Sequence, residues 1–220
     1  MIAPPDHNRI IAAAAKAVLA PIGCIRKGRS RTWLDDHEWW VGVIEFQPSA
    51  WSRGSYLNVG ACWLWDEKDY FSFDYGARDH DARVEPFQEF KTTEEFSDSA
   101  RFLAEQAKVE VVRLRERFKT IRDVARNLCR NSSLGIWDNY HAGVASGIIG
   151  DVLIAKTKFA GVFNEDSETA WIKKLKTRCA ELAALVGDCQ RFRSDVARVI
   201  SRTRDNLKLP HINAGAVLEL

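Results

Sequence analysis

The chain has 220 residues, of which 46% are hydrophobic and 28% are charged, a composition typical of a globular protein with a core of its own. Its 32 Lys and Arg residues nearly balance its 30 Asp and Glu residues, so the formal net charge is +2. This balance excludes binding of nucleic acid or membranes through bulk positive charge, and any such binding must come from local clusters.

The five cysteines are odd in number, scattered along the chain and include no C-x-x-C pair. A disulfide framework needs an even set of cysteines in an exported chain, and a zinc site needs closely spaced thiolates. The sequence therefore predicts five reduced, mostly buried thiols and no bound metal or cofactor.

The first predicted element is a short helix near the N-terminus, with Asp6 as its N-cap and an end before Pro21. Its apolar run, IIAAAAKAVLAPIG, lacks the preceding basic segment of a secretory signal and is interrupted by Lys16. No stretch approaches the roughly 18 apolar residues that a membrane-spanning helix needs. We therefore expect a cytoplasmic protein with no membrane partner.

Antiparallel strands are predicted from Arg29 to Tyr75, where β-branched and aromatic residues alternate with polar ones. Six of the eight tryptophans lie between Trp33 and Trp65. The predicted strands cover residues 30–35, 39–47, 56–65 and about 70–75. Polar turns between short consecutive strands favour an antiparallel meander over parallel strands joined by helices.

The central hairpin, residues 39–65, has one register that separates apolar from polar side chains. If Gln47 pairs with Tyr56, one face is apolar throughout, whereas a shift by one residue mixes the two faces. The apolar face is predicted to lie in the core and includes Trp40, Ile44, Phe46, Val59 and Trp63. The opposite face carries polar residues near the connecting loop, namely Glu45, Gln47, Tyr56 and Asn58.

Helical periodicity dominates from Thr92 onward. The spacing Thr92-x-x-Glu95 predicts a capping box at the start of a long helix, and Thr120-x-x-Asp123 predicts a restart. Further helices are predicted over residues 137–150, 151–162, 171–186 and 188–203. Pro210 is expected to close the ordered region and to leave a loose tail over residues 211–220.

Residues 140–162 resemble a single helical hairpin of the tetratricopeptide type. Gly143, Ala155 and Phe159 have the small-residue and aromatic spacing of that repeat, with a turn at Gly150–Asp151. A solenoid needs about three stacked repeats, and the sequence shows no second copy. The alternative is an ordinary pair of closely packed helices.

These elements predict an α+β fold, with an antiparallel sheet of about four strands covered by helices on one face and followed by a C-terminal helical bundle. The predicted organisation is residues 1–90 for the N-terminal helix and sheet, 91–210 for the helical part and 211–220 for the tail. We expect these parts to form one compact unit.

The polar side of the hairpin is the first candidate binding site. Its strand residues can supply hydrogen bonds, and the loop between the strands presents an aromatic residue and a cation, types enriched at binding hot spots. The candidate residues are Glu45, Gln47, Tyr56 and Asn58 on the strands and Trp51 and Arg53 in the loop. They predict a non-catalytic protein that binds a protein or peptide partner through an open sheet face. The alternative is a solvated face with no partner.

Two basic clusters predict a different function, the binding or conversion of a phosphate-containing ligand or of nucleic acid. The first is RKGRSR, residues 26–31, in which Lys27, Arg29 and Arg31 are the candidate phosphate ligands. The second is a stripe in the helical segment 113–130, formed at steps of three and four by Arg115, Lys119, Arg122, Arg126 and Arg130. The alternative for this stripe is a solvated helix face.

Two segments combine acids with histidine, as metal sites do, at residues 35–38 and 79–81. Neither has the ligand spacing of a known site, and hairpin turns collect such residues for turn chemistry. Asp35 with Glu45 and Gln47 also resembles the strand carboxylates of metal-dependent nucleases, although Gln47 stands where those enzymes carry lysine. No nucleophile elbow, phosphate loop or dinucleotide fingerprint occurs, and no catalytic residue is assigned.

Residues 9–66 contain a series of short motifs in a distinctive order. The series comprises Gly23, Lys27–Gly28–Arg29, Trp33, Phe46–Gln47, Ser49 and Asn58–Val59–Gly60. In this order the motifs resemble the bacterial family called domain of unknown function 4304, although Cys24 stands where an aromatic residue is usual. That family has no established activity or catalytic residues. The resemblance implies only that Gln47, Ser49 and Asn58 belong to a recurring pattern.

Overall fold

The computed structural model describes residues 7–76, 87–130, 135–167 and 169–218. Contacts within the chain group it into two compact units. Unit 1 comprises Met1–Cys62 and Phe71–Arg115, and unit 2 comprises Trp63–Tyr70 and Glu116–Leu220. Most of the long helix after the sheet therefore groups with the sheet, and residues 63–70 group with the later helices.

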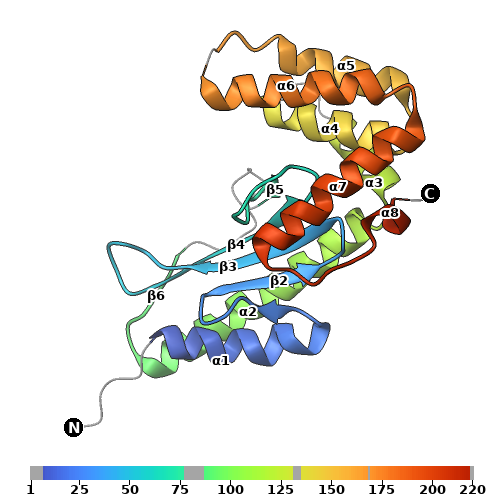
Figure 1. The fold of residues 1–220 in the computed structure, drawn as a ribbon. Helices are drawn as coiled ribbons and strands as arrows, with labels where there is room; N and C mark the ends of the chain where they lie inside the picture. The colour runs from blue at the N-terminus through green and yellow to red at the C-terminus, as the bar shows by residue number, and fades with distance from the viewer. Residues whose placement is uncertain (1–6, 77–86, 131–134, 168, 219–220) are drawn as a thin grey trace. The chain divides into compact units, whose positions relative to one another are not determined.

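Unit 1 contains an antiparallel sheet (Figure 1), and the predicted α+β fold with a C-terminal helical region is confirmed. The six strands are β1 (Ile25–Arg26), β2 (Thr32–Asp36), β3 (Trp40–Gln47), β4 (Gly54–Trp63), β5 (Tyr75–Gly76) and β6 (Gln88–Glu89). Their order is β1-β2-β3-β4-β5, and β6 also pairs with β4. The sequence predicts fewer strands because β1 and β6 have two residues each, too few to show an alternating pattern.

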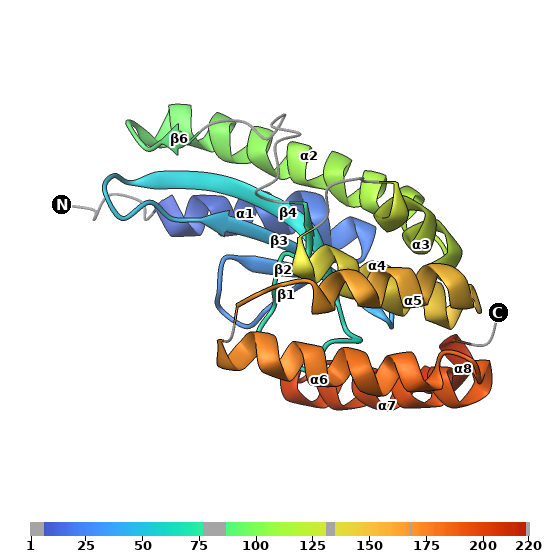
Figure 2. The ribbon, with the colours of Figure 1, turned by 90° about the horizontal axis from the view of Figure 1, so that it is seen from above.

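Strands β3 and β4 are the longest and form a hairpin whose loop end extends beyond the neighbouring strands (Figure 2). Strand β2 pairs with β3 so that Trp33 lies opposite Ile44 and Leu34 lies opposite Val43. The predicted register places five apolar residues in the core, and each of them is at most 6% exposed: Trp40, Ile44, Phe46, Val59 and Trp63. The predicted burial of this set is therefore confirmed.

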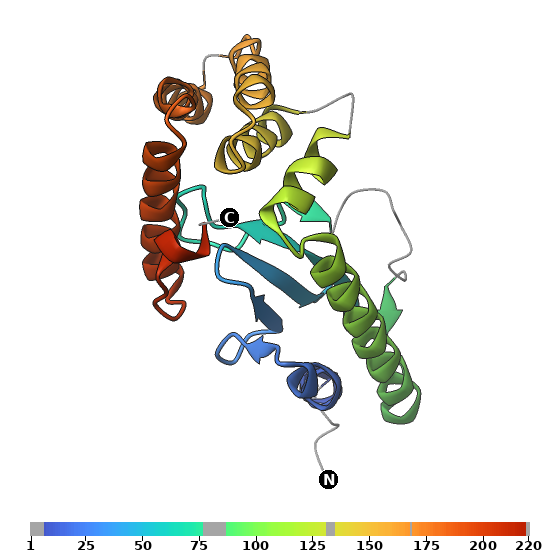
Figure 3. The same cartoon turned by 90° about the vertical axis from the view of Figure 1, so that its right-hand side faces the viewer.

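Two helices of unit 1, α1 (His7–Leu19) and α2 (Thr93–Arg117), lie on the same side of the strands (Figure 3). Each buries an apolar stripe at steps of three and four, for example Ile11 and Ala15 in α1. The predicted cap of α2 is present, since Thr92 Oγ1 accepts a hydrogen bond from the Glu95 backbone at 3.2 Å. Helix α1 passes into a short 3-10 turn, η1 (Ala20–Ile22), which ends at Gly23 in the left-handed conformation.

The second face of the hairpin, which the sequence predicts to be open, is buried along much of its length. Val41 is 0% exposed and Val43 is 2% exposed. The predicted fourth strand is also shorter than expected, since within residues 70–76 only Tyr75 and Gly76 pair with β4. Phe71 lies under the Lys27 ammonium, and Ser72 Oγ lies 3.4 Å from the Cys62 thiol. Because Val41 and Val43 are buried, the predicted open sheet face is wrong for the part of the hairpin that carries them.

Unit 2 is helical. Its helices are α3 (Ile121–Cys129), α4 (Ile136–Ile148), α5 (Val152–Phe163), α6 (Ala170–Leu185), α7 (Cys189–Leu207) and α8 (Ala214–Val217). Thr120, Asp151 and Asp188 accept backbone hydrogen bonds as the N-caps of α3, α5 and α7. These starts follow the predicted ones, because a cap is a local interaction that the sequence displays directly.

Helices α4 and α5 pack closely at Gly143, as the small-residue spacing predicts. A Cβ atom at this position would lie 2.6 Å from the Phe159 ring, which is fully buried.

The expectation of a loose tail over residues 211–220 is wrong for the part that the structure describes. Helix α8 packs on α7, and Ala214 and Leu218 are 3% and 0% exposed, so this segment is anchored by apolar contacts.

Within the described part of the chain, no helix combines the length and apolar character needed to cross a membrane.

Candidate functional site

The predicted polar site on the hairpin is an internal hydrogen-bond network. Asn58 is 8% exposed, and its Nδ2 donates to Gln47 Oε1 at 2.8 Å and to Glu45 Oε2 at 3.2 Å. The three side chains thus share one face, in agreement with the predicted register. Because they bond to one another across β3 and β4, their evident role is to join the two strands.

The exposed part of this predicted site lies at the loop end of the hairpin. Trp51 is 96% exposed and Tyr56 is 42% exposed, and Arg53 is also exposed. The Tyr56 ring lies 4.8 Å from the Phe87 ring. The structure therefore separates the predicted residues into a buried network around Asn58 and an exposed hairpin tip.

The RKGRSR cluster forms a tight turn in which two of the three candidate cations are engaged within the protein. Arg31 Nη1 donates to the Gly54 carbonyl at 3.2 Å, and Lys27 Nζ lies 4.6 Å from the centre of the Phe71 ring. Arg29 remains exposed. A phosphate site built from all three cations would have to break these contacts.

The predicted basic stripe is interrupted. Helix α2 ends at Arg117, and Thr120 caps a separate helix that begins at Ile121. Arg115 is directed toward Asp35, to which it donates two hydrogen bonds. A continuous row of cations on one helix is therefore wrong, because Thr120 caps a separate helix.

Asp35 is the centre of a buried ionic cluster in unit 1. It is 4% exposed, and its Oδ1 and Oδ2 accept from Arg115 Nη2 at 2.7 Å and Nε at 2.9 Å. His37 Nε2 lies 2.7 Å from Asp35 Oδ2, and Arg115 Nη2 also donates to the Ile22 carbonyl at 2.7 Å. The cluster therefore ties the β2–β3 turn to the end of α2 and to the turn after α1.

The environment of this cluster shifts the pKa values of Asp35, Cys24 and Arg115, the last of which is raised by its hydrogen bonds to Asp35. Burial acts to raise the pKa of Asp35, but hydrogen bonds and charge from His37 and Arg115 hold it below its ordinary value of 3.8. Burial, followed by the negative charge of Asp35, raises the pKa of the Cys24 thiol to about 12. Cys24 is therefore a protonated thiol at neutral pH, and Asp35 is an ionised partner of Arg115.

The nuclease-like arrangement predicted for Asp35, Glu45 and Gln47 is not formed. Thr32 lies opposite Glu45 in the β2–β3 ladder, and Asp35 follows three residues later, so the two carboxylates lie on opposite faces. Within the described residues, no group of three or more His, Cys, Asp or Glu side chains could hold a metal ion. The other predicted acidic segment, residues 79–81, lies outside the described residues.

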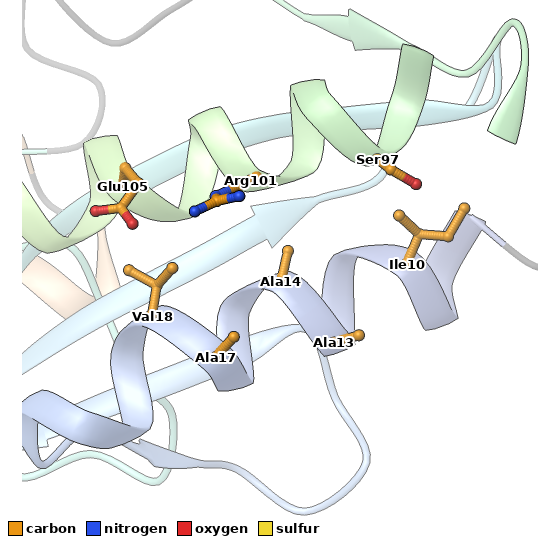
Figure 4. A pocket seen from close by; sticks show the side chains of 8 residues that line it. All are labelled: Ile10, Ala13, Ala14, Ala17, Val18, Ser97, Arg101 and Glu105. Carbon is orange, nitrogen blue, oxygen red and sulfur yellow. The ribbon is translucent and has the colours of Figure 1, made fainter. Parts of the chain in front are cut away.

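A groove of about 510 Å³ runs between α1 and α2 in unit 1 (Figure 4). Its α1 wall is made of small and apolar side chains, including Ala14, Ala17 and Val18, while α2 contributes Arg101 and Glu105. The two walls thus differ in polarity.

The largest cavity described here, about 790 Å³, lies in unit 2 between α4, α6, α7 and the loop of residues 66–70. We call it the aromatic cavity. Two hydrogen bonds hold the loop in place, a buried one from Tyr140 Oη to the Trp65 carbonyl at 3.1 Å and a partly buried one from Thr203 Oγ1 to the Asp66 carbonyl at 3.2 Å. The cavity is lined by Asp66, Glu67, Lys68, Asp69, Tyr70, Trp137, Tyr140, Trp171, Lys174, Leu175, Thr177, Arg178, Glu181, Val199 and Arg202.

A row of stacked rings forms one wall of the aromatic cavity and continues into the core. Trp171 and Trp137 are nearly parallel, with ring centres 5.9 Å apart, and Trp137 stacks on His141 at 5.7 Å. Trp65 Nε1 donates to His141 Nδ1 at 3.1 Å, so this nitrogen carries no proton. Exposure falls from 48% at Trp171 and 39% at Trp137 to 2% at His141. The solvent end of the row therefore offers an aromatic surface inside the cavity.

The charges of the aromatic cavity are balanced, with four basic and four acidic side chains in its lining. Three cations are paired: Lys68 with Asp66 at 3.6 Å, Arg202 with Glu67 at 3.0 Å and Arg178 with Glu181 at 3.1 Å. The other two charged residues, Lys174 and Asp69, each have no hydrogen bond or ion pair with any described residue.

Tyr140 closes the inner end of the aromatic cavity and is fixed as a neutral phenol. Burial, and then the negative charge of Asp66, raises its pKa above the ordinary value of 10.0. Its hydroxyl group therefore remains a donor to the Trp65 carbonyl at neutral pH.

Sequence reasoning did not find the aromatic cavity, because its lining comes from segments that are far apart in the chain. Trp171 marks the apolar stripe of a predicted helix, and Trp137 lies at a predicted helix start. In the structure the buried stripe of α6 begins at Ile172, and Trp171 is 48% exposed.

Comparisons with protein-family models, curated proteins and solved structures found no match to this chain. A function therefore has to be argued from the geometry of the described residues.

Proposed function

We propose that this protein is a non-catalytic binding protein and that the aromatic cavity is its ligand site. The observation that carries the proposal is a cavity of about 790 Å³ that is lined by the exposed rings of Trp137 and Trp171. The same lining contains the charged groups of Lys174 and Asp69, which have no ion pair with any described residue. Ligand sites are typically concave, of about 300–1,000 Å³, with apolar or aromatic walls and a few polar groups that orient the ligand.

The aromatic wall supports binding of a ligand that contains a flat ring. Stacking of a ligand ring on an exposed tryptophan contributes about 1–3 kcal/mol. Trp137 is already held in the row between Trp171 and His141, so little side-chain entropy is lost on binding. The site is therefore partly organised before a ligand arrives.

A binding role is favoured over a catalytic one by the state of the reactive groups. Burial raises the pKa of both Cys24 and Cys179 to about 12, which keeps these thiols protonated and poorly nucleophilic at neutral pH. Three of the four cations in the cavity are held in ion pairs. The paired cations therefore organise the cavity, and none of its described lining residues is a cysteine.

The test is binding of four small phenyl compounds that differ in charge: phenylacetamide, phenylacetate, phenethylammonium and L-phenylalanine. None of them absorbs where tryptophan is excited, so protein fluorescence reports binding. We expect at least one saturable titration that Trp171→Ala abolishes and that Trp51→Ala, at an exposed tryptophan outside the cavity, leaves unchanged. If no compound binds, or if Trp171→Ala has no effect, the aromatic cavity is not the ligand site.

A second candidate is the binding of a protein or peptide partner at the hairpin tip. It is favoured by Trp51, which is 96% exposed, and by the neighbouring exposed Arg53. The network around Asn58 joins the two strands that carry this tip. A photo-crosslinking amino acid at position 51 should capture a discrete partner in host cells, and the added change Arg53→Ala should reduce the yield of crosslinked partner. An equal yield with and without Arg53→Ala would argue against this surface.

Three further expectations from the sequence are kept as part of the proposal. A cytoplasmic location is supported by five cysteines that are all free. Membership in the family called domain of unknown function 4304 rests on the motifs of residues 9–66. Binding of phosphate or nucleic acid is the least supported, because Lys27, Arg31 and Arg115 are engaged within the protein.

A further inference from the structure

The two uncommitted charges of the aromatic cavity have opposite signs. Lys174 and Asp69 both line the cavity, and neither has a hydrogen bond or ion pair with any described residue. The other six charged groups of the lining include three cations that are each paired with an acid. The cavity therefore offers one free positive and one free negative group to whatever enters it.

Lys174 is placed to act together with the aromatic wall. It follows Trp171 by three residues on α6, and side chains with this spacing lie on the same face of a helix. A negative group attached to a ring that stacks on Trp171 would therefore lie near the Lys174 ammonium. Asp69 precedes Tyr70, which is 61% exposed, in the loop of residues 66–70 that also lines the cavity.

The balance of charge disfavours a strongly anionic ligand. A phosphate ester would gain from Lys174, but it would also meet the carboxylates of the lining, one of which, Asp69, has no ion pair with any described residue. A simple cation would gain from Asp69 and meet Lys174 with the same sign. A ligand with one charge of each sign satisfies both groups and leaves neither of them unpaired on binding.

We propose that the aromatic cavity binds a zwitterionic ligand with an aromatic ring, namely an aromatic amino acid or a short peptide that contains one. The ring stacks on Trp171, the ligand carboxylate pairs with Lys174 and the ligand ammonium pairs with Asp69. This inference rests on the proposed function of the same cavity and specifies its ligand class. The volume of about 790 Å³ accommodates either source.

The test compares the dissociation constants of six probes by tryptophan fluorescence. L-phenylalanine and the dipeptide glycyl-L-phenylalanine carry both charges, whereas phenylacetate, phenethylammonium and phenylacetamide lack one or both. L-cyclohexylalanine keeps both charges and lacks the aromatic ring. We expect the better of the two zwitterions to bind about five-fold more tightly than any singly charged probe, and L-cyclohexylalanine to bind more weakly than L-phenylalanine. The ratio between L-phenylalanine and the dipeptide distinguishes a free amino acid from a peptide.

Two charge variants assign the ends of the ligand. Lys174→Gln should weaken L-phenylalanine and phenylacetate about five-fold and leave phenethylammonium unchanged, and Asp69→Asn should do the reverse. Lys156→Gln and Asp166→Asn are matched controls, because they make the same chemical changes at exposed positions outside the lining. Circular dichroism and melting temperatures verify that each variant is folded.

The outcomes separate this inference from the proposed function. If phenylacetate or phenethylammonium binds as tightly as both zwitterions, or if neither charge variant changes any affinity, the zwitterion assignment is wrong while the cavity remains a ring-binding site. If no probe binds in a manner that depends on Trp171, both the ligand class and the proposed function are wrong.

Discussion

Replacement of Asp35 by asparagine should lower the free energy of unfolding by about 3 kcal/mol at pH 7. Asparagine keeps the size of the side chain but removes the charge that Arg115 meets at 2.7 Å and 2.9 Å. Loss of one partner from a buried ion pair costs about 3–5 kcal/mol. The Arg115 side chain is 31% exposed and keeps its bond to the Ile22 carbonyl, so water and that bond compensate in part and the lower end of the range applies.

The effect should also depend on pH with a defined sign. The pKa of Asp35 lies below its ordinary value of 3.8 in the folded protein, so the ionised form is the one that stabilises the fold. This contribution is fully present above pH 3.8 and is lost as the pH falls through the folded-state pKa. The stabilities of the parent protein and the Asp35→Asn variant should therefore converge in acid.

The assay is urea-induced unfolding followed by tryptophan fluorescence, with Asp35→Asn, Arg115→Met and the double variant completing a thermodynamic cycle. We expect a coupling energy above about 1.5 kcal/mol. Glu110→Gln is the control, because Glu110 and Arg113 form a surface pair at 2.8 Å on α2 that should contribute less than about 1 kcal/mol. A coupling energy for Asp35 and Arg115 no larger than this surface value would refute the argument from burial.

Three further predictions follow from packing, hydrogen bonding and thiol chemistry. Gly143→Ala should cost about 1–3 kcal/mol in chemical denaturation, despite the better helix propensity of alanine, because its Cβ would lie 2.6 Å from the Phe159 ring; Gly187→Ala, with no atom within 4 Å, should be nearly neutral. Asn58→Ala should cost about 1–3 kcal/mol, since it removes the donor to two partly buried oxygens, and an unchanged melting temperature would contradict the network. Iodoacetamide at pH 8 should leave the two thiols with a pKa of about 12 unmodified and should label the less buried thiols. Mass spectrometry measures the labelling of each cysteine, and equal labelling of both kinds would contradict the argument from burial. The protected residues are Cys24 and Cys179, and the labelled ones are Cys129 and Cys189.

The elements that could be predicted from the sequence are those with local causes. Thr120 and Asp188 cap their helices through hydrogen bonds to residues three positions later, so the caps are visible in the sequence as short motifs. Alternation along β3 and β4 identifies one apolar face and predicts the burial of Trp40 and Phe46. Strands β1 and β6 are exceptions, because two residues do not make a pattern and pairing with a neighbour alone defines them.

The candidate site depended on contacts that no local pattern contains. Arg115 belongs to a basic stripe in the sequence, but it meets Asp35 across 80 residues, and this pairing removes both from the functions that their patterns suggested. At the aromatic cavity, Tyr140 donates a hydrogen bond to the Trp65 carbonyl, and Thr203 of α7 donates one to the Asp66 carbonyl, 137 residues away in the chain. The sequence by itself determined the helix starts, the strands long enough to alternate and the apolar core face, because these follow from backbone hydrogen bonding and burial over a few residues. The tertiary structure alone decided which polar groups are satisfied internally and which charges stay free in a cavity, because that depends on how distant segments pack.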